Sequence, residues 1–335
     1  MNIEKELSKT CESHILLSEK SKNTSYYQDF IDMIECLEHH LKAKSNGRRI
    51  LKDIVGNKLQ IGKRKFDYKQ YIQGASEVTV VAFFLKKFAD SFIYEPSVNR
   101  SLNRNVECQF KDNIYKFNIE VKTPDFSTQE EQKKSDSIKI SSMGRFDDYF
   151  DISDELKPLF KNESENLYHG EPVIDQKRMD NNAKNFLCDA HDKFPEFSGK
   201  NCLNILVICL DDLDSIDEWS EYFHYQKGFF KPDSFVPHKE FNRVDLVVFT
   251  NLYCKHNRKV TNCDNSWFFE KCFNLASRNM YAQLIKPEAT IVANDIITNY
   301  TEDFESYIKN NPIPIFQIKH FYHKELKFKL DYSLF

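Results

Sequence analysis

The chain has 335 residues, of which 41% are hydrophobic, 29% charged and 14% aromatic, and its formal net charge is −4. This composition excludes an intrinsically disordered chain and a coiled coil, and the length suits two domains or one elaborated domain. Because there are only eight glycines and no G-x-x-x-x-G-K-[ST] or G-x-G-x-x-G motif, P-loop nucleotidases and typical dinucleotide-binding enzymes are also excluded.

The N-terminal region, residues 1–45, is predicted to be helical, with apolar and aromatic side chains at helical spacing from Tyr27 to Leu37. Its first residues are polar where a secretory signal would be apolar, and no run of about 18 apolar residues could span a bilayer. The nine scattered cysteines, without a C-x-x-C pair, fit reduced thiols. We therefore expect a cytoplasmic protein without a membrane partner.

A basic segment follows between Lys42 and Lys69, where ten basic and two acidic residues give a local charge of +8. A phosphate backbone is an obvious partner for such a segment, although a solvated helix and loop face would have the same composition. The candidate nucleic-acid-binding residues are Arg48, Arg49, Lys63, Arg64 and Lys65.

The next predicted helix runs over about 69–92 and contains Glu77 within its apolar face, since Val81, Leu85 and Phe88 lie within 80° of it at 100° per residue. A carboxylate directed at a core is costly unless it is paired or bound to a metal ion. Glu77 is thus a candidate site residue, with a position at the wet edge of the core as the alternative.

Two short segments of alternating polarity, 105–110 and 114–123, are predicted to form a β-hairpin around a turn at Asp112 and Asn113. If those two residues form the loop, the numbers of opposed residues sum to 225 and the apolar side chains of both strands share one face. Asn105, Glu107, Glu120 and Lys122 then share the other face.

Two carboxylates near a backbone carbonyl form a hard oxygen site that suits Mg²⁺, and a nearby ammonium can stabilise developing negative charge or orient a water molecule. This combination indicates phosphodiester hydrolysis. An ordinary Glu–Lys ladder on a solvated hairpin is the alternative.

A polar insertion is predicted at about 124–170, followed by a helix over about 175–194. The apolar runs 203–210 and 245–250 are typical of strands buried on both faces. The last 85 residues have no clear signature.

Residues 69–250 contain, in order, a helical Glu (GASEVTVVAFFLKKF), a carboxylate at the start of a hairpin (NVECQF), E-x-K on its second strand (FNIEVKTPD), a helix and an apolar strand. This order resembles that of the PD-(D/E)xK nuclease superfamily. The resemblance implies an α/β fold, with a restriction-endonuclease-like mixed sheet flanked by helices. A basic helical N-terminal region (1–68) and a C-terminal extension (251–335) would adjoin this core.

The resemblance also implies that Glu107, Glu120 and the carbonyl of Val121 bind Mg²⁺, for which Mn²⁺ could substitute. Glu77 would complete the metal shell and Lys122 would assist the attacking water. The family usually has Asp at the first acidic position, so either Glu107 serves there or Asn105 occupies the place and the site is weakened.

The expected function is that of a Mg²⁺-dependent endodeoxyribonuclease of a bacterial restriction or anti-phage defence system, acting on DNA as a homodimer or with a defence-system partner. A catalytically weak nucleic-acid-binding or scaffold subunit, an RNA-directed nuclease and an accidental match are the alternatives. An accidental match would leave the four site residues scattered in the folded protein.

Overall fold

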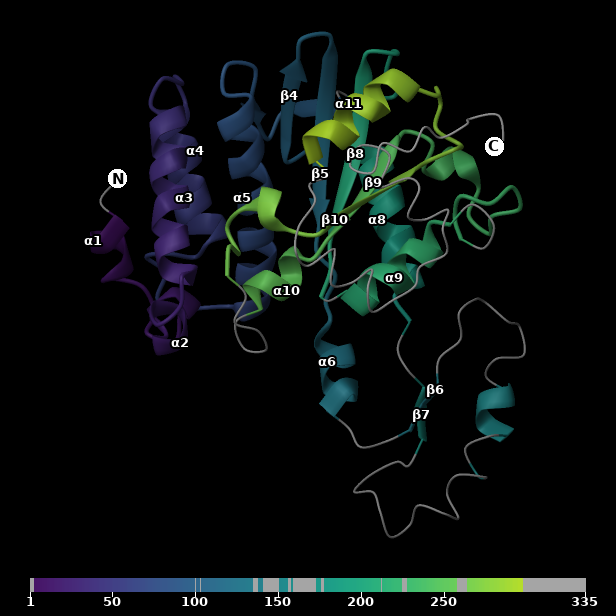
Figure 1. Ribbon diagram of the computed structural model, residues 1–335, viewed down its shortest axis with the longest axis horizontal. Helices are drawn as coiled ribbons and strands as arrows, with labels where there is room; N and C mark the ends of the chain where they lie inside the picture. The colour runs from purple at the N-terminus through teal and green to yellow at the C-terminus, as the bar shows by residue number, and fades with distance from the viewer. Residues whose placement is uncertain are drawn as a thin grey trace.

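A computed structural model describes residues 3–99, 101–102, 104–134, 138–140, 151–155, 158, 173–175, 178–211, 213–224, 228–257 and 264–297. Its core is a six-stranded mixed sheet with helices on both faces (Figure 1). The predicted fold class is confirmed as a mixed α/β sheet flanked by helices. Most of the predicted insertion at 124–170 lies outside the described residues, as do residues 298–335 of the predicted C-terminal extension.

The sheet has the strand order β1-β4-β5-β8-β9-β10, in which β5, β8 and β9 are parallel to one another and the remaining neighbours are antiparallel. Its strands are β1 (Ile93–Tyr94), β4 (Cys108–Asp112), β5 (Tyr115–Lys122), β8 (Cys202–Cys209), β9 (Leu246–Thr250) and β10 (Asn274–Arg278). The apolar runs 203–210 and 245–250 coincide with β8 and β9 to within one residue. Because β10 pairs with β9, the boundary expected at residue 250 divides this sheet.

The hairpin of β4 and β5 has the predicted pairing of faces but a shifted register. Cys108 lies opposite Ile119 and Asp112 opposite Tyr115, so opposed residues sum to 227 and the loop is Asn113–Ile114. The turn predicted at Asp112 and Asn113 is therefore wrong by one residue. Asn113 takes the left-handed conformation, with φ of 40°, that two-residue hairpin loops require. Because 227 is also odd, the apolar side chains still share one face.

Helix α5 (Tyr68–Lys87) covers the apolar face of this hairpin. Phe84 stacks on Phe110 at 4.6 Å between ring centroids, and Phe110 stacks on Phe117 at 5.0 Å. The predicted helix over 69–92 is thus confirmed, ending five residues earlier. Asp67 caps its N-terminus by accepting a hydrogen bond from the Gln70 N–H.

The N-terminal region is helical, as predicted, and α3 packs against α5. Its elements are α1 (Ile3–Leu7), a 3-10 turn (Ile15–Leu17), α2 (Glu19–Lys22), α3 (Tyr26–Leu41), α4 (Gly47–Asp53) and the π-helical segment η2 (Ile54–Lys58). Tyr26 on α3 bonds the hydroxyl of Tyr71 at 2.8 Å and Nδ1 of His256 at 3.0 Å, and all three side chains are buried. This contact joins the N-terminal helices to α5 and to α10 (Leu252–His256).

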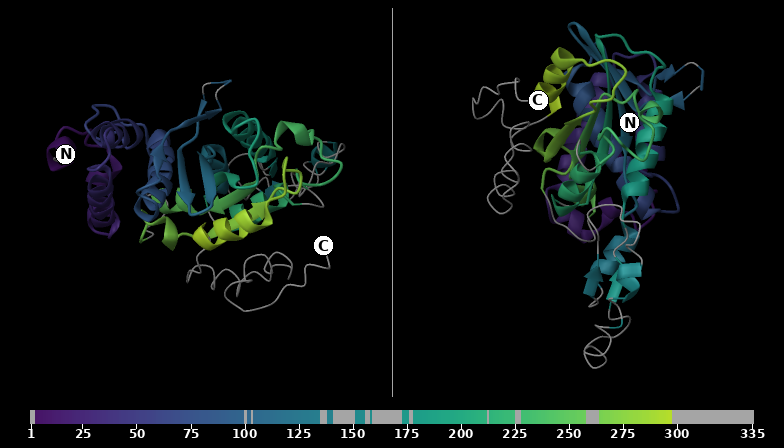
Figure 2. Two further views of the ribbon diagram at one scale, coloured as in Figure 1. Left: turned by 90° about the horizontal axis from the view of Figure 1, so that it is seen from above. Right: turned by 90° about the vertical axis from the view of Figure 1, so that its right-hand side faces the viewer.

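The opposite face of the sheet lies under α8 (Asp180–Lys193), the helix predicted over about 175–194, and α9 (Leu213–Tyr222) packs beside α8. Figure 2 shows α8 and α11 (Pro287–Ile297) on opposite sides of the sheet. The amide side chains of Gln109, Asn118 and Asn204 form a buried hydrogen-bonded row across β4, β5 and β8, with contacts of 2.6 and 2.7 Å. This row satisfies the polar groups that the sheet buries there.

The remaining elements flank this body. They are β2 (Ser97–Asn99) paired with β3 (Arg104–Asn105), α6 (Ser127–Lys134), β6 (Ile138–Ile140) paired with β7 (Val173–Asp175), and the 3-10 turns His238–Glu240 and Phe269–Lys271.

Segment η2 lies directly against the middle of α5 because Gly74 has no side chain. A Cβ added to Gly74 would stand 2.1 Å from the backbone oxygen of Lys58. A glycine inside a helix normally costs about 1 kcal/mol relative to alanine, so its place here is explained by the close approach of the two backbones. The contact fixes where the side chain of Lys58 begins.

We expect Gly74→Ala to lower the free energy of unfolding by about 1–3 kcal/mol, because the added methyl group overpacks this contact. Gly56→Ala in η2 is the matched control, since nothing lies within 4 Å of its added Cβ. Urea unfolding should leave the control unchanged or slightly more stable. Equal stability of the two variants would contradict the proposed packing role of Gly74.

Candidate active site

Glu120 lies where the hairpin strands separate. The pairing of β4 with β5 ends at Cys108 and Ile119, and β5 continues for three more residues beside β8. Extending the register by one residue would place Glu107 opposite Glu120, a spacing at which Cβ atoms are about 5 Å apart. Both carboxylates therefore lie at the same break in the sheet.

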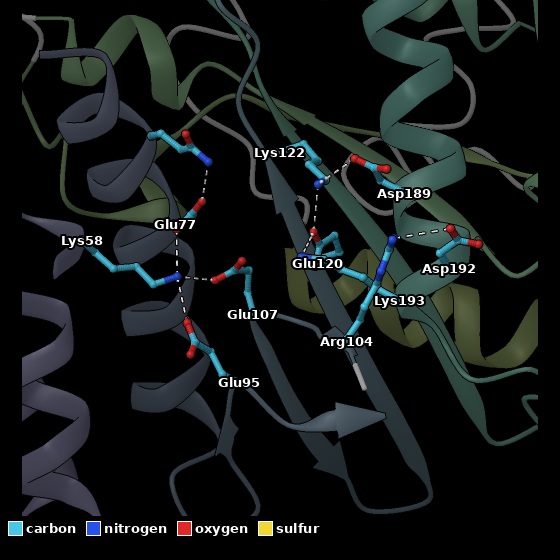
Figure 3. Close-up of polar contacts among 11 residues, drawn as sticks. Lys58, Glu77, Glu95, Arg104, Glu107, Glu120, Lys122, Asp189, Asp192 and Lys193 are labelled. Carbon is cyan, nitrogen blue, oxygen red and sulfur yellow. Dashed lines mark hydrogen bonds and ion pairs between the residues drawn. The ribbon is translucent and has the colours of Figure 1, made fainter. Parts of the chain in front are cut away.

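Two ammonium groups approach Glu120, whose side chain is only 1% exposed. Lys193, from the last turn of α8, donates to Glu120 Oε1 at 2.6 Å, and Lys122 lies 3.4 Å from the same oxygen. Lys122 also contacts Asp189 of α8 at 3.4 Å (Figure 3). One oxygen of Glu120 is thus held both by Lys193 of α8, which covers this face of the sheet, and by Lys122 of β5 itself.

A second group of charges surrounds Lys58 at the end of η2. Its ammonium nitrogen lies 2.9 Å from Glu77, 3.1 Å from Glu95 and 2.7 Å from Glu107 (Figure 3). The carboxylates come from α5, from the turn after β1 and from the residue before β4. Gln73 supplies one further hydrogen bond, to Oε1 of Glu77 at 3.1 Å.

The backbone around this group adopts uncommon conformations. Lys58 ends a π-helical turn, and such turns occur often at functional sites. Glu95 has a φ of 44°, a strained value for a residue with a side chain, and its N–H donates to the carbonyl of Glu107 at 3.0 Å. These two features bring the side chain of Glu95 to the ammonium of Lys58, which also contacts Glu107.

The pKa values in this group are shifted by burial and by the neighbouring charges. Burial alone would lower the pKa of Lys58, but the carboxylates of Glu107 and Glu77 outweigh it and raise that pKa well above the usual lysine value. Burial and the neighbouring charge of Glu107 raise the pKa of Glu77, although Lys58 opposes them. One ammonium therefore does not fully compensate the acids that share it.

Burial raises the pKa of Glu120 to about 7, with a further contribution from Glu107, while Lys193 and Lys122 oppose the shift. The second oxygen of this carboxylate, Oε2, is buried without a hydrogen-bond partner. A buried polar atom without a partner costs free energy, so a proton or a cation would be favoured there.

The structure brings together the four residues predicted to act in the site. Glu77 and Glu107 share Lys58, while Glu120 and Lys122 contact each other. Val121 lies between the last two in β5 and is buried, so its backbone carbonyl belongs to the same strand end. The scattered arrangement expected of an accidental match is not observed.

Asn105 and Glu107 have different surroundings. Asn105 is exposed and pairs with Ser97 in the separate β2–β3 ribbon. Glu107 is 9% exposed and contacts Lys58. Of the two residues considered for the first acidic position, Glu107 is thus the one that joins the charged group.

The predicted nucleic-acid-binding residues lie toward opposite ends of α5, a helix about 30 Å long at 1.5 Å per residue. Arg48 and Arg49 are exposed at the start of α4, which is near the C-terminus of α5 because Lys44 donates to the Phe92 carbonyl. The exposed residues Lys63, Arg64 and Lys65 directly precede the N-terminus of α5.

Only the second group lies at the end of α5 that adjoins the C-terminus of β5. Lys69, in the first turn of α5, bonds Asp125 at 3.0 Å, three residues beyond Lys122. The five basic residues therefore do not form one compact patch, and Lys63, Arg64 and Lys65 lie on the side of Lys122.

Sequence reasoning missed Lys58, Glu95 and Lys193. Lys58 was part of the basic segment and resembled its solvated neighbours, yet it is half-buried and its ammonium faces the acids. The one available signal was Gly74, because a glycine inside a helix indicates a close backbone approach. Glu95 and Lys193 had no comparable signal.

The donor set fits Mg²⁺ through two carboxylates. Among the residues that the structure describes, no group of three or more His, Cys, Asp or Glu side chains could hold a metal ion. Mg²⁺, however, is commonly bound by one or two carboxylates together with water and phosphate oxygens. Glu107, Glu120 with its unpartnered Oε2, and the carbonyl of Val121 are oxygen donors of this kind.

Comparisons with protein-family models, with curated proteins and with solved structures find no match. The nuclease resemblance therefore rests on the residues of this chain alone. No helix in the described ranges has the length and apolar character needed to cross a membrane.

We expect the free energy of unfolding to fall as the pH rises from about 4.5 to about 7 in metal-free buffer. Over this range the folded protein, with a pKa near 7 at Glu120, binds more protons than the unfolded chain does. The decrease due to Glu120 should be about 3 kcal/mol, at 1.36 kcal/mol per pKa unit. It should disappear in Glu120→Gln.

Urea unfolding in EDTA at pH 4.5, 6 and 8 measures this effect, with Glu131→Gln, a change at an exposed carboxyl, as the control. Relative to wild type, Glu120→Gln should be more stable at pH 8 than at pH 4.5. A stability difference that does not change with pH would contradict the raised pKa of Glu120.

Proposed function

We propose that the protein is a Mg²⁺-dependent phosphodiesterase that acts as an endonuclease on DNA. The observation that carries this proposal is the convergence of Glu107, Glu120 and Lys122 where β4 and β5 separate, with one buried oxygen of Glu120 still without a partner. A hard cation at this position would be next to an ammonium, and phosphate hydrolysis uses both.

The ion would be held by Glu107, Glu120 and the carbonyl of Val121. Glu77 would support it indirectly, because Glu77 and Glu107 both contact the ammonium of Lys58. When bound, Mg²⁺ supplies a Lewis acid that lowers the pKa of a water molecule and balances the charge of the phosphate. The buried position of Glu120 strengthens this electrostatic interaction, because little water competes for the carboxylate.

Lys122 has the position to act on the attacking water. Its side chain is 18% exposed, and its ammonium is held between Glu120 and Asp189 at 3.4 Å from each. An ammonium held in place can orient a water molecule and stabilise negative charge as it develops on the phosphate, without having to reorganise during the reaction.

Three parts of the proposal follow from the resemblance to PD-(D/E)xK nucleases. They are the choice of DNA as the substrate, a restriction or anti-phage defence setting, and action as a homodimer or with a defence-system partner. Cleavage of both strands is favoured when two copies place two sites on one duplex, in keeping with the prevalence of two-fold oligomers. An RNA substrate would use the same hydrolytic groups, so matched DNA and RNA substrates belong in every assay.

The second candidate function is a nucleic-acid-binding or scaffold subunit without catalysis. The ammonium groups of Lys58 and Lys193 favour it, because they already hold oxygens of Glu107 and Glu120 at 2.7 and 2.6 Å. Such a subunit would bind DNA in a salt-dependent manner without a divalent-metal requirement and would not nick it in Mg²⁺ or Mn²⁺.

Wild-type protein is expected to cleave plasmid DNA in Mg²⁺ but not in EDTA. Glu120→Gln and Lys122→Ala should each lower the rate at least about 100-fold, the scale on which single acid-base or electrostatic groups act. Rates of plasmid relaxation and linearisation measure the effect.

The matched controls are Glu131→Gln and Lys111→Ala, which remove one exposed acid and one exposed lysine. Both should keep wild-type rates. Equal activity of wild type, EDTA-treated protein and both site variants would eliminate the nuclease, and salt-dependent binding without nicking would support the second candidate.

Replacing Lys63, Arg64 and Lys65 together by Ala should weaken DNA binding more than replacing Arg48 and Arg49, because the first three lie at the end of α5 near Lys122. Each lost phosphate contact should reduce the slope of log K against log salt by about 1. Fluorescence anisotropy at several salt concentrations, without divalent ions, measures both slopes. A larger loss in the Arg48/Arg49 variant would place the DNA at the other end of α5.

A further inference from the structure

We propose that Lys58 is a built-in cation: its ammonium occupies the position among Glu77, Glu95 and Glu107 where a second divalent ion would otherwise bind. The site therefore takes one divalent ion, on the side of Glu107 and Glu120. The identity of that single ion rests on the proposed function, whereas the role of Lys58 rests on the contacts described above.

Lys58 lies among three acids that enclose its ammonium. As they stand around it, these acids are not arranged to hold a metal ion themselves, which is true of every group of three or more His, Cys, Asp or Glu side chains among the described residues. Three carboxylate oxygens from three separate elements converge within 3.1 Å of one nitrogen atom. An ordinary surface ion pair joins two flexible side chains and contributes little. Here the side chains of Lys58, Glu77 and Glu107 are only 10–14% exposed, so the ammonium is enclosed by the acids that it neutralises.

The charges of the whole site support a single divalent ion. The acids Glu77, Glu95, Glu107, Glu120 and Asp189 face the ammonium groups of Lys58, Lys122 and Lys193. With every group ionised, this set has a formal charge of −2, which one divalent cation neutralises. Without Lys58 the charge would be −3, and three adjoining carboxylates would lack a cation.

The backbone also holds Lys58 in place, through the contact between η2 and α5. Gly74 permits the backbone of Lys58 to lie against α5, and the π-helical turn of η2 directs the chain there. Since these features act on the main chain, they keep the ammonium at the carboxylates independently of the first ion. An ammonium also cannot activate a second water as a metal ion does, so the proposed chemistry would depend on one metal-bound water.

The test is the number of Mn²⁺ ions bound per full-length chain, measured by electron paramagnetic resonance of free Mn²⁺. Wild type is expected to bind one ion. Lys58→Met should bind one more, and Lys58→Met/Glu77→Gln should lose the additional ion. The same number and affinity in Lys58→Met and wild type would overturn the proposal.

Lys193→Met is the matched control, because it also removes a partly buried ammonium but releases only Glu120, which Lys122 still contacts. It should not gain an ion. A gain equal to that of Lys58→Met would show a general charge effect and would overturn the assignment to the position of Lys58.

Failure of the proposed function has a different signature. If wild type binds no Mn²⁺ and Lys58→Met binds one, Lys58 keeps its role and the metal-dependent function is lost. If metal-free Lys58→Met is unfolded, circular dichroism during Mn²⁺ titration replaces the count. Recovery of native structure supports the built-in cation, and an absence of recovery counts against it.

Discussion

The arrangement of the site depends on the contacts of the Lys58 ammonium with the carboxylates of Glu77, Glu95 and Glu107. Without that ammonium, the three carboxylates would repel one another at these short distances. Removing one partner from a buried ion pair commonly costs about 3–5 kcal/mol. The same contact joins η2, α5, the turn after β1 and the start of β4. Charge compensation and the packing of these four segments are therefore one constraint, and a change in either would disturb both.

Much of the fold could be predicted because the signals are local. β8 and β9 are continuous apolar runs, and the face shared by Cys108, Phe110, Phe117 and Ile119 follows from alternation alone. The loop position was less well determined, since Asp112 and Asn113 both favour turns, whereas the observed pairing of Asp112 with Tyr115 makes the loop Asn113–Ile114. An even shift would preserve the faces in any case, so the error did not reach the predicted site.

The acidic residues of the site were also accessible from the sequence, since helical and strand periodicity placed Glu77, Glu107 and Glu120 on particular faces. Their cationic partners were not. Lys58 is 49 residues from Glu107, and Lys193 is 73 residues from Glu120. Such pairs form only through tertiary packing, and a lysine among many exposed lysines has no local mark of burial. The basic segment was thus correctly located along the chain, but all of its side chains were assigned to the surface. One of them, Lys58, faces the interior.

The close approach at Gly74 also bears on modularity. A core beginning at residue 69 would retain every acid of the site, the sheet and α8, but it would lack the lysine that compensates three of those acids. The helical N-terminal region is consequently required by the site. If a fusion, a circular permutation or a natural rearrangement separated this region from α5, another positive charge would have to replace that of Lys58. In proteins that share this site, a change at residue 58 should therefore be accompanied by a change at residue 74.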